Sequence, residues 1–462
     1  MSRVTTVLAA LSCLAAFCCS AAAGTGGRVL RVGKDKQFKT VRSACSACRD
    51  GDTIEIDAGV YKGDVCKWSR NDITIRGVGG MAHLDAAGKN EGGKGTFVIH
   101  GRNVTVENIE FSGSKVRDEN GAGIRAHGRG LTVRNCYFHD NENGILGGGG
   151  SQSDVLIEYC EFARNGHGDG YSHNMYISHV RSLTVRFTYT HHAKIGHNLK
   201  SRAQRNIILY NRIMDEADGR SSYSLDLPNG GFSVVMGNLV QQGPRTDNST
   251  IFAYAAEGAK NPDSRLYVVN NTFVNDRSRG NFLSVRSCTG GLVANNIFLG
   301  RGGVKSGKAE MKNNFTTADS KILVDRAAYD YRLTAAAAGA IDKAIDAGSA
   351  AEFLLKPVAH YVHKSRGEER LLQGAAPDIG AYEFGAEARR KYEPGLIALV
   401  SPKAPPPKPV AAPKPEPKPG PTPGAPPKPP PPPPPPPEPI VRTPKQICQG
   451  WYSMARNYRN AG

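Results

Sequence analysis

Residues 104–108 read Val-Thr-Val-Glu-Asn, and this short segment decides the fold because close variants of it return along the chain. Residues 131–135 read Leu-Thr-Val-Arg-Asn, and residues 183–187 read Leu-Thr-Val-Arg-Phe. Each unit carries two apolar residues two positions apart, which is the periodicity of a β-strand with one buried side. A unit this short buries too little apolar surface to fold alone, so stacked units must share one core. Further units begin at Val155, Ile207, Val234 and Leu266, at a spacing of roughly 24 to 32 residues.

Most units also carry an asparagine four residues after the first apolar position, as Asn108 and Asn135 do. Stacked asparagines can donate hydrogen bonds to one another along the axis of such a stack. Helical spacing occurs near the N-terminus, over residues 38–45. The sequence therefore predicts an all-β fold, a single-stranded parallel β-helix with a short N-terminal helical cap and a disordered Pro-rich C-terminal tail. The residues expected to be aligned and buried are Leu131, Val155, Leu183, Ile207 and Val234.

Changes in composition divide the chain into six predicted segments. The first residues combine Arg3 with an apolar run and end in three alanines, as a secretory signal does. Proline with interspersed lysine fills residues 402–444, which favours an extended polyproline II tether. The segments are a signal peptide (1–23), an N-terminal cap (24–70), the β-helix (71–320), a C-terminal region packed on the end of the helix (321–395), a Pro/Lys-rich linker (396–446) and a terminal segment with a helical stripe (447–462).

The signal predicts a secreted or periplasmic protein, and no other stretch is apolar and long enough to span a membrane. Seven of the ten cysteines follow the signal, so at least one thiol is expected to be free or paired with another molecule. One pair among Cys45, Cys48 and Cys66 could form a disulfide. Cys136 and Cys160 occupy equivalent repeat positions, where a thiol packs as a small apolar group.

The net charge of +17 indicates a polyanionic partner. The tail and the signal account for part of it, which leaves roughly +9 on the body of the chain. For an exported protein, the polyanion that we expect is an acidic polysaccharide. Nucleic acid is not expected, because the chain shows no aromatic stacking platform and no groove-reading motif.

Three units end in Asn-x-x-Phe, at residues 108–111, 135–138 and 270–273. The chain also contains Ala-Ile-Asp-Lys-Ala-Ile-Asp-Ala-Gly at 340–348 and Asp-Ile-Gly-Ala-Tyr-Glu at 378–383. Together with the capping segment, these features resemble the right-handed parallel β-helix proteins of the pectate-lyase-like superfamily. The resemblance covers about residues 28–385 and implies a right-handed helix. This fold carries lyases, hydrolases, epimerases and non-catalytic binding proteins, so the activity must be argued from the site.

Polar residues gather in three successive segments of similar form, at 173–177, 197–201 and 223–227. Strand periodicity places alternate residues of each segment on opposite sides. The residues predicted to point inward are Met175, Leu199 and Leu225. Those predicted to share the outward side are Asn174, Tyr176, Asn198, Lys200, Arg202, Ser224 and Asp226.

If the three segments stack in register, Tyr176, Lys200 and Asp226 form one outward column with about 4.8 Å between neighbours. Breaking an acidic polysaccharide by β-elimination needs a base, a cation that stabilises the enolate, and an acid for the leaving oxygen. A lysine base must be neutral, so we expect Lys200 to be partly buried or to lie closer to another cation than to Asp226. The candidate catalytic residues are Lys200, Asp226, His197 and Tyr176, and the candidate substrate-binding residues are Asn174, Asn198, Arg202, His173, His191 and His192.

The segment from Lys200 to Asn211 is similar to the catalytic-lysine rung of chondroitinase-B-like and alginate lyases, and this similarity implies a base at Lys200. The arginine of that family falls on Pro228 here, and Ala193 and Ile195 stand where its acidic calcium ligands are expected. No cofactor is therefore assigned. No metal site is predicted either, because two adjacent histidines, 191 and 192, point to opposite sides of an extended chain.

Two functions follow from these observations. The first is an exported enzyme that binds and processes acidic polysaccharide, a lyase by β-elimination at a uronic acid, with a glycoside hydrolase or epimerase as the runner-up. The second is a non-catalytic envelope protein whose β-helix binds glycan and whose Pro-rich tail tethers it to the cell wall or an envelope partner. The polar density around Lys200 favours the first, and the absent arginine and calcium ligands favour the second.

Overall fold

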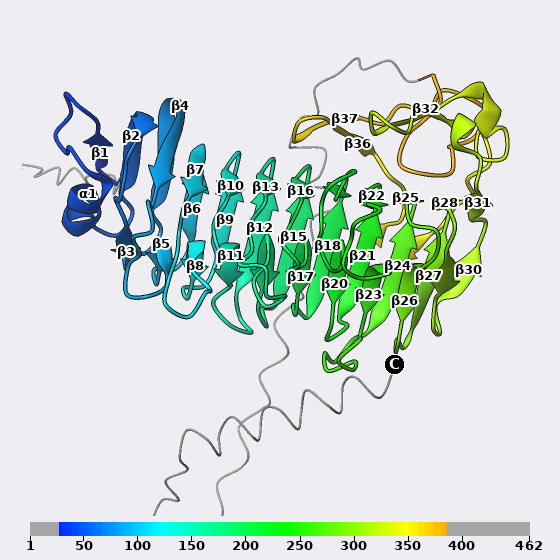
Figure 1. Ribbon diagram of the computed structural model, residues 1–462, viewed down its shortest axis with the longest axis horizontal. Helices are drawn as coiled ribbons and strands as arrows, with labels where there is room; N and C mark the ends of the chain where they lie inside the picture. The colour runs from blue at the N-terminus through cyan, green and yellow to red at the C-terminus, as the bar shows by residue number, and fades with distance from the viewer. Residues whose placement is uncertain (1–26, 386–462) are drawn as a thin grey trace, which may run out of the picture. The chain divides into compact units, whose positions relative to one another are not determined.

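The computed structural model describes residues 27–385, and these form a right-handed parallel β-helix with a small C-terminal region on its side (Figure 1). The predicted fold class and the N-terminal helical cap are confirmed. The predicted signal, the Pro/Lys-rich linker and the terminal segment lie outside the described residues. No helix within residues 27–385 is long and apolar enough to cross a membrane.

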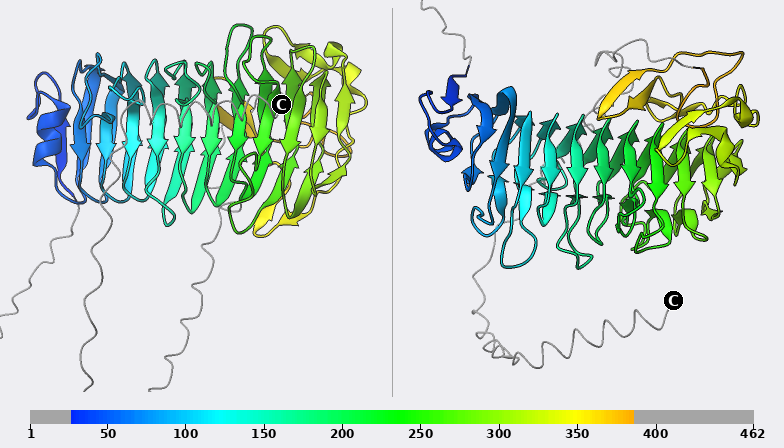
Figure 2. Two further views of the ribbon diagram at one scale, coloured as in Figure 1. Left: turned by 60° about the horizontal axis from the view of Figure 1, so that its bottom comes forward. Right: turned by 45° about the horizontal axis from the view of Figure 1, so that its top comes forward.

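Each turn of the helix contributes strands to three parallel ladders, which we call faces A, B and C, and the chain runs through them in the order A, C, B (Figure 2). Face A consists of β1 (Val29–Val32), β2 (Thr53–Val60), β4 (Thr74–Asp85), β6 (Val104–Glu107), β9 (Leu131–Arg134), β12 (Asp154–Glu158), β15 (Ser182–Arg186), β18 (Arg205–Leu209), β21 (Phe232–Met236), β24 (Arg265–Val269), β27 (Gly290–Ala294) and β30 (Glu310–Lys312).

Face B consists of β3 (Cys66–Trp68), β5 (Gly95–Ile99), β8 (Ala122–Ala126), β11 (Asn143–Gly147), β14 (Met175–Ile177), β17 (Leu199–Ser201), β20 (Leu225–Leu227), β23 (Thr250–Tyr254), β26 (Asn281–Val285) and β29 (Gly303–Lys305). Face C begins with the second half of β4 and continues through β7 (Ile109–Ser112), β10 (Tyr137–His139), β13 (Glu161–Ala163), β16 (Tyr189–His191), β19 (Arg212–Met214), β22 (Leu239–Gln242), β25 (Thr272–Asn275), β28 (Ile297–Gly300) and β31 (Phe315–Thr317).

The N-terminal segment covers the open end of the helix and also supplies rungs. Helix α1 (Val41–Ala47) begins at Thr40, whose side chain accepts a hydrogen bond from the Ser43 N–H. It buries Val41 and Ala44 against the first turn. Because β1 pairs in parallel with β2, the ladder of face A already starts within the predicted cap.

Stacked side chains fill the interior, as the repeat predicts. The rings of Phe111, Phe138 and Phe162 stack with centroids 4.9 and 4.7 Å apart. Along an inner ladder of asparagines, each side chain donates a hydrogen bond to the next, which satisfies polar groups that are buried in all members but the half-buried last one. The members of this ladder are Asn211, Asn238, Asn271, Asn296 and Asn314.

The predicted register of the core is wrong at β18 and β21. Leu131, Val155 and Leu183 are paired and buried, but the partner of Leu183 in β18 is Asn206 rather than Ile207. Ile207 and its partner Val234 are buried on the opposite side of the sheet. They are covered there by an apolar cluster that includes Phe353, Leu355 and Ala359 from the C-terminal region.

That C-terminal region was expected on the end of the helix and instead lies along its side (Figures 1 and 2). The Ser365 hydroxyl donates to the Cys160 carbonyl at 2.8 Å, in the middle of the stack. The region consists of 3₁₀ turns at Ser320–Ile322 and Ala335–Ala337 and of β32 (Leu323–Asp325), β33 (Asp330–Leu333), β34 (Ser349–Ala350), β35 (Phe353–Leu354), β36 (Ala359–Val362) and β37 (Arg366–Glu369).

All six cysteines within residues 27–385 are free thiols. The disulfide considered among Cys45, Cys48 and Cys66 is therefore not present there. Cys136 and Cys160 are buried in the core, as predicted.

Candidate active site

The outward column of face B is present. Tyr176 in β14 pairs with Lys200 in β17, which pairs with Asp226 in β20. The inward neighbours of these residues are fully buried and fix their orientation, because strand side chains alternate. Those neighbours are Met175, Leu199 and Leu225.

Lys200 is partly buried, as expected, with 14% of its side chain exposed. Its Nζ lies 3.8 Å from Asp226 Oδ2 and 5.3 Å from the centre of the Tyr176 ring. Burial lowers the pKa of Lys200; the Asp226 carboxylate acts in the opposite direction, and the Arg202 guanidinium adds to the lowering. The environment therefore favours a neutral amine more than bulk water does.

Asp226 lies beneath the lysine with only 4% of its side chain exposed. Its Oδ2 is also 3.4 Å from His197 Nε2, whereas its Oδ1 is buried without a hydrogen-bond partner. Burial raises the pKa of Asp226 to about 7, and the Lys200 charge offsets only part of this effect. A carboxyl group with such a pKa exchanges a proton near neutral pH, which is the property of a general acid or base.

Two stacked histidines, His173 and His197, form the side of the cluster where the chain enters face B. Their ring centres are 4.7 Å apart. His173 Nδ1 accepts a hydrogen bond from the backbone N–H of His197 at 3.0 Å. His197 Nδ1 accepts one from the backbone N–H of Tyr223 at 3.3 Å. Each neutral ring then carries its proton on Nε2, so His197 presents an N–H toward Asp226.

Burial keeps both rings neutral. It lowers the pKa of His173 to about 3, with the charge of Lys200 as the next cause. Burial, followed by His173 and Lys200, lowers the pKa of His197 well below its ordinary value. The two histidines therefore act as fixed hydrogen-bonding groups at neutral pH rather than as cations.

Arg202 bounds the other side of the cluster, where face B ends. Its guanidinium pairs with both carboxylate oxygens of Glu257, at 2.7 and 2.8 Å, and donates to the Tyr176 hydroxyl at 2.7 Å and to Asn229 Oδ1 at 2.5 Å. The hydrogen bond from Arg202 occupies a lone pair of the phenol oxygen and leaves the Tyr176 O–H free to donate elsewhere.

Asn174 and Asn198 do not face outward, and this part of the prediction is wrong. Both side chains are fully buried in a second polar ladder at the turn between faces C and B. Asn174 donates to Asn198 Oδ1 at 3.0 Å, and Asn198 donates to Asp215 Oδ1 at 3.0 Å. Because these residues precede the first strand position, the turn rather than strand alternation sets their direction. They hold the loops in place and cannot contact a polymer on the surface.

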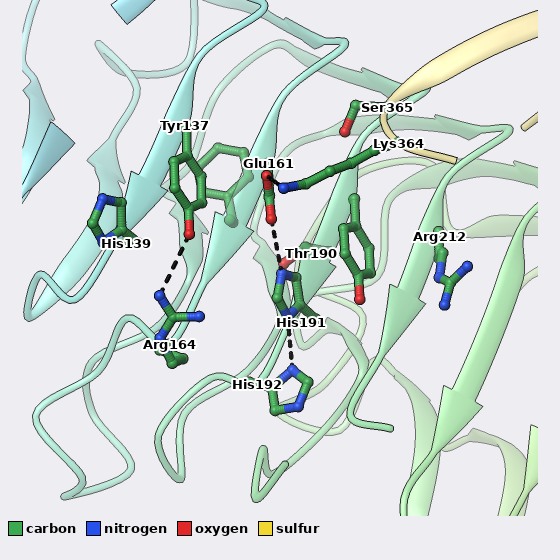
Figure 3. A network of polar contacts seen from close by, with 12 residues as sticks. Tyr137, His139, Glu161, Arg164, Thr190, His191, His192, Arg212, Lys364 and Ser365 are labelled. Carbon is green, nitrogen blue, oxygen red and sulfur yellow. Dashed lines mark hydrogen bonds and ion pairs between the residues drawn. The ribbon is translucent and has the colours of Figure 1, made fainter. Parts of the chain in front are cut away.

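His191 and His192 belong to a different cluster, on face C and the loop that follows it (Figure 3). Their Nδ1 atoms are 2.6 Å apart, so the rings converge rather than point to opposite sides as predicted. The cause is the positive φ of His192, 53°, which turns the chain out of the extended conformation. His191 Nε2 lies 3.3 Å from Glu161, which also pairs with Lys364 of the C-terminal region.

The sequence alone did not identify Glu257, Asn229 or Tyr223 as members of the cluster. Glu257 lies in a loop two rungs beyond Arg202, outside the three repeated segments. The sequence feature that could have indicated Glu257 is the wider spacing of the repeat after Val234, which predicts a longer loop between the faces at this position.

Comparison with known proteins supports the fold. The family described as right handed beta helix region matches residues 58–244. The pectate lyase Pel9A is 14% identical in sequence, with 78% of this chain and 98% of that chain aligned at a TM-score of 0.56.

A weaker structural similarity is found to an alginate lyase from Paenibacillus sp. str. FPU-7. It is 13% identical in sequence and aligns over 63% of this chain and 99% of that chain at a TM-score of 0.38. The A-module of the mannuronan C-5 epimerase AlgE6 from Azotobacter vinelandii is 12% identical and aligns over 64% and 92% at a TM-score of 0.37. No curated protein sequence matches the chain. At these identities the likeness concerns the fold, and the chemistry is argued from the residues.

Proposed function

We propose that this protein is an exported polysaccharide lyase that cleaves an acidic polysaccharide by β-elimination at a uronic acid, with its site on face B. The observation that carries the proposal is a partly buried lysine with a lowered pKa, held beside a phenol and a nearly buried carboxyl group. The open face of a β-helix suits a long polymer, and the excess of positive charge suits a polyanion. The similar fold of a pectate lyase is consistent with this substrate class.

In the proposed reaction, neutral Lys200 removes the proton on C5 of the uronic acid, next to its carboxylate. The electron pair forms the C4–C5 double bond and the C4–O bond breaks. The Tyr176 hydroxyl gives its proton to the leaving oxygen, and the proton on Lys200 returns to Tyr176 before the next turnover. Arg202 supplies positive charge for the enolate, although its pairing with Glu257 reduces that charge.

The test is incubation of the full chain with polymers of galacturonate, mannuronate, guluronate and glucuronate, followed in the ultraviolet. A lyase produces a 4,5-unsaturated uronate, which absorbs there, together with one new reducing end per cleavage. New reducing ends without absorbance indicate hydrolysis. Binding of a polymer without either product supports the non-catalytic envelope protein instead.

Hydrolysis is the second candidate because of the environment of Asp226. Its raised pKa of about 7 and the His197 N–H beside it suit a carboxyl group that donates a proton to a glycosidic oxygen. The two reactions make different predictions for the same substitution.

We expect Asp226→Asn to retain activity and to shift its pH dependence if Lys200 is the base. The Asp226 carboxylate raises the pKa of Lys200, so its removal lowers that pKa and increases the neutral fraction at any given pH. The rising limb of kcat/KM against pH should therefore move to lower pH. Asp154→Asn, on face A and paired with Arg181, is the matched control and should leave the profile unchanged. Loss of turnover at every pH in Asp226→Asn would favour hydrolysis.

Binding to the preferred polyuronate should weaken steeply as salt is added, because a positively charged body attracts the polymer through screened charge. The affinity can be measured by isothermal titration at low and high ionic strength, with a neutral glucan as the control ligand. Affinity that is independent of salt, or a preference for the neutral glucan, would contradict the polyanion assignment.

A further inference from the structure

Three neighbouring rungs of face C, on the N-terminal side of the rung where Lys364 of the C-terminal region pairs with Glu161, bring two imidazoles and a carboxylate together. His83 of β4 and Glu110 of β7 are paired in register, and Glu110 is in turn paired with Tyr137, two residues before His139 in β10. One ligand atom from each of His83, Glu110 and His139 lies within 4.8 Å of the other two. Each side chain is 16 to 26% exposed, so the group is accessible from solvent.

One nitrogen of each ring lies near the same carboxylate oxygen, although the hydrogen-bond partner of His83 Nε2 is the Ser112 hydroxyl at 2.7 Å. His139 Nε2 lies 2.9 Å and His83 Nε2 3.7 Å from Glu110 Oε1. In a tetrahedral zinc site with bonds near 2.0–2.1 Å, neighbouring ligand atoms are about 3.3 Å apart. One of the two N···O distances is slightly shorter than this separation and the other is slightly longer. To complete the site, His83 Nε2 would exchange its hydrogen bond with the Ser112 hydroxyl for the metal.

The other ring nitrogen of His139 is already oriented. His139 Nδ1 lies 2.9 Å from Asp140 Oδ2, and that carboxylate also accepts from Arg164 at 3.1 Å. A carboxylate behind a ligating histidine fixes the ring and directs the lone pair of its Nε2 outward, as in many zinc sites. The Tyr137 ring stacks on the His139 ring, with 4.4 Å between the two ring centres, and so restricts the orientation of the imidazole.

The carboxylate of Glu110 also differs from its counterparts on face A. Glu107 and Glu158 pair with Arg134, and Glu158 pairs with Arg186 as well. Within residues 27–385, the ion pairs of Glu110 are with the two histidines. Among the described residues, no arginine or lysine therefore neutralises this carboxylate, and it is available to a cation.

We propose that His83, Glu110 and His139 bind one divalent transition-metal ion of the zinc type, with Asp140 as the positioning residue behind His139. Two imidazoles and a carboxylate suit zinc and its neighbours rather than calcium or magnesium, which prefer oxygen ligands. Three protein ligands leave a position open to water. The site lies on face C and does not depend on the activity proposed for face B.

The experiment is titration of the metal-free, untagged full chain with Co²⁺ and with Zn²⁺, by absorption spectroscopy and isothermal titration. We expect one saturable site whose Co²⁺ complex shows d–d bands without the sulfur-to-metal charge-transfer band of a thiolate site. This distinction is needed because Cys45 and Cys66 lie close together and both are free. Ca²⁺ and Mg²⁺ should not compete, and Zn²⁺ should raise Tm.

His139→Ala and the near-isosteric Glu110→Gln should each weaken Co²⁺ binding by about 100-fold or more, because two ligands would remain of three. Asp140→Asn should weaken it by about 10- to 100-fold, as removal of a partner behind a ligand does. The matched control is His127→Ala, since His127 stacks on His100 elsewhere in the helix, and it should bind normally. An absence of saturable binding, unchanged binding in both ligand variants, or a charge-transfer band that is lost in Cys66→Ser would overturn the assignment.

Discussion

Lys200→Ala is expected to abolish formation of the unsaturated product, with a fall in turnover of about 10²- to 10⁴-fold, the usual contribution of a general base. Lys200→Arg should fail as well, because a guanidinium stays protonated and cannot accept a proton. The measurement is the initial rate of ultraviolet absorbance on the polymer that the wild type cleaves.

The loss should be catalytic rather than structural. The Lys200 side chain points away from the core, so we expect its truncation to change the free energy of unfolding by less than about 1 kcal/mol. The loss of the ammonium also raises the pKa of Asp226 further, which favours the neutral form of this buried carboxyl group.

Lys305→Ala is the matched control for this experiment. Lys305 lies in the same outward row of face B, three rungs beyond Asp226 through Ala253 and Ser284. It should retain full turnover. If Lys200→Ala retains turnover too, the lyase mechanism is wrong, and Asp226 with His197 becomes the pair to test for hydrolysis.

Asn198→Ala should destabilise the protein strongly, although the sequence predicts that Asn198 binds substrate. Its side chain accepts from Asn174 at 3.0 Å and from the Ala193 N–H at 3.1 Å, and it donates to Asp215. The substitution leaves these buried groups without partners, at about 1–3 kcal/mol for each group that water cannot reach. We expect a loss of about 2–5 kcal/mol in the free energy of unfolding by urea denaturation.

The two roles of Asn198 are separable by experiment. A substrate contact would raise KM and leave Tm unchanged, whereas a buried ladder residue lowers Tm first. Gln204→Ala is the control, because Gln204 is partly exposed at the next corner and hydrogen-bonds to His179 at 3.4 Å. It should cost less than about 0.5 kcal/mol. Normal stability with a raised KM in Asn198→Ala would restore the substrate-binding interpretation.

The spacing of apolar residues was sufficient to predict the stacked fold and the column on face B. A strand has a period of two, and a parallel ladder places equivalent positions side by side, so Tyr176, Lys200 and Asp226 had to meet once their segments were aligned. The same rule failed at Ile207 and Val234, because an apolar residue on either side of a sheet gives the same pattern when both sides are covered.

The sequence by itself determined the β-helix, its helical cap and the residues that share the outward row, because each depends on local periodicity. Only the tertiary structure decided which polar residues belong together around that row. Turns between the faces direct Asn174 and Asn198 inward and separate His191 and His192 from Lys200, and a loop two rungs away brings Glu257 to Arg202. The raised pKa of Asp226 likewise depends on its burial among residues from several rungs. Strand periodicity carries no information about neighbours that are so distant in the sequence.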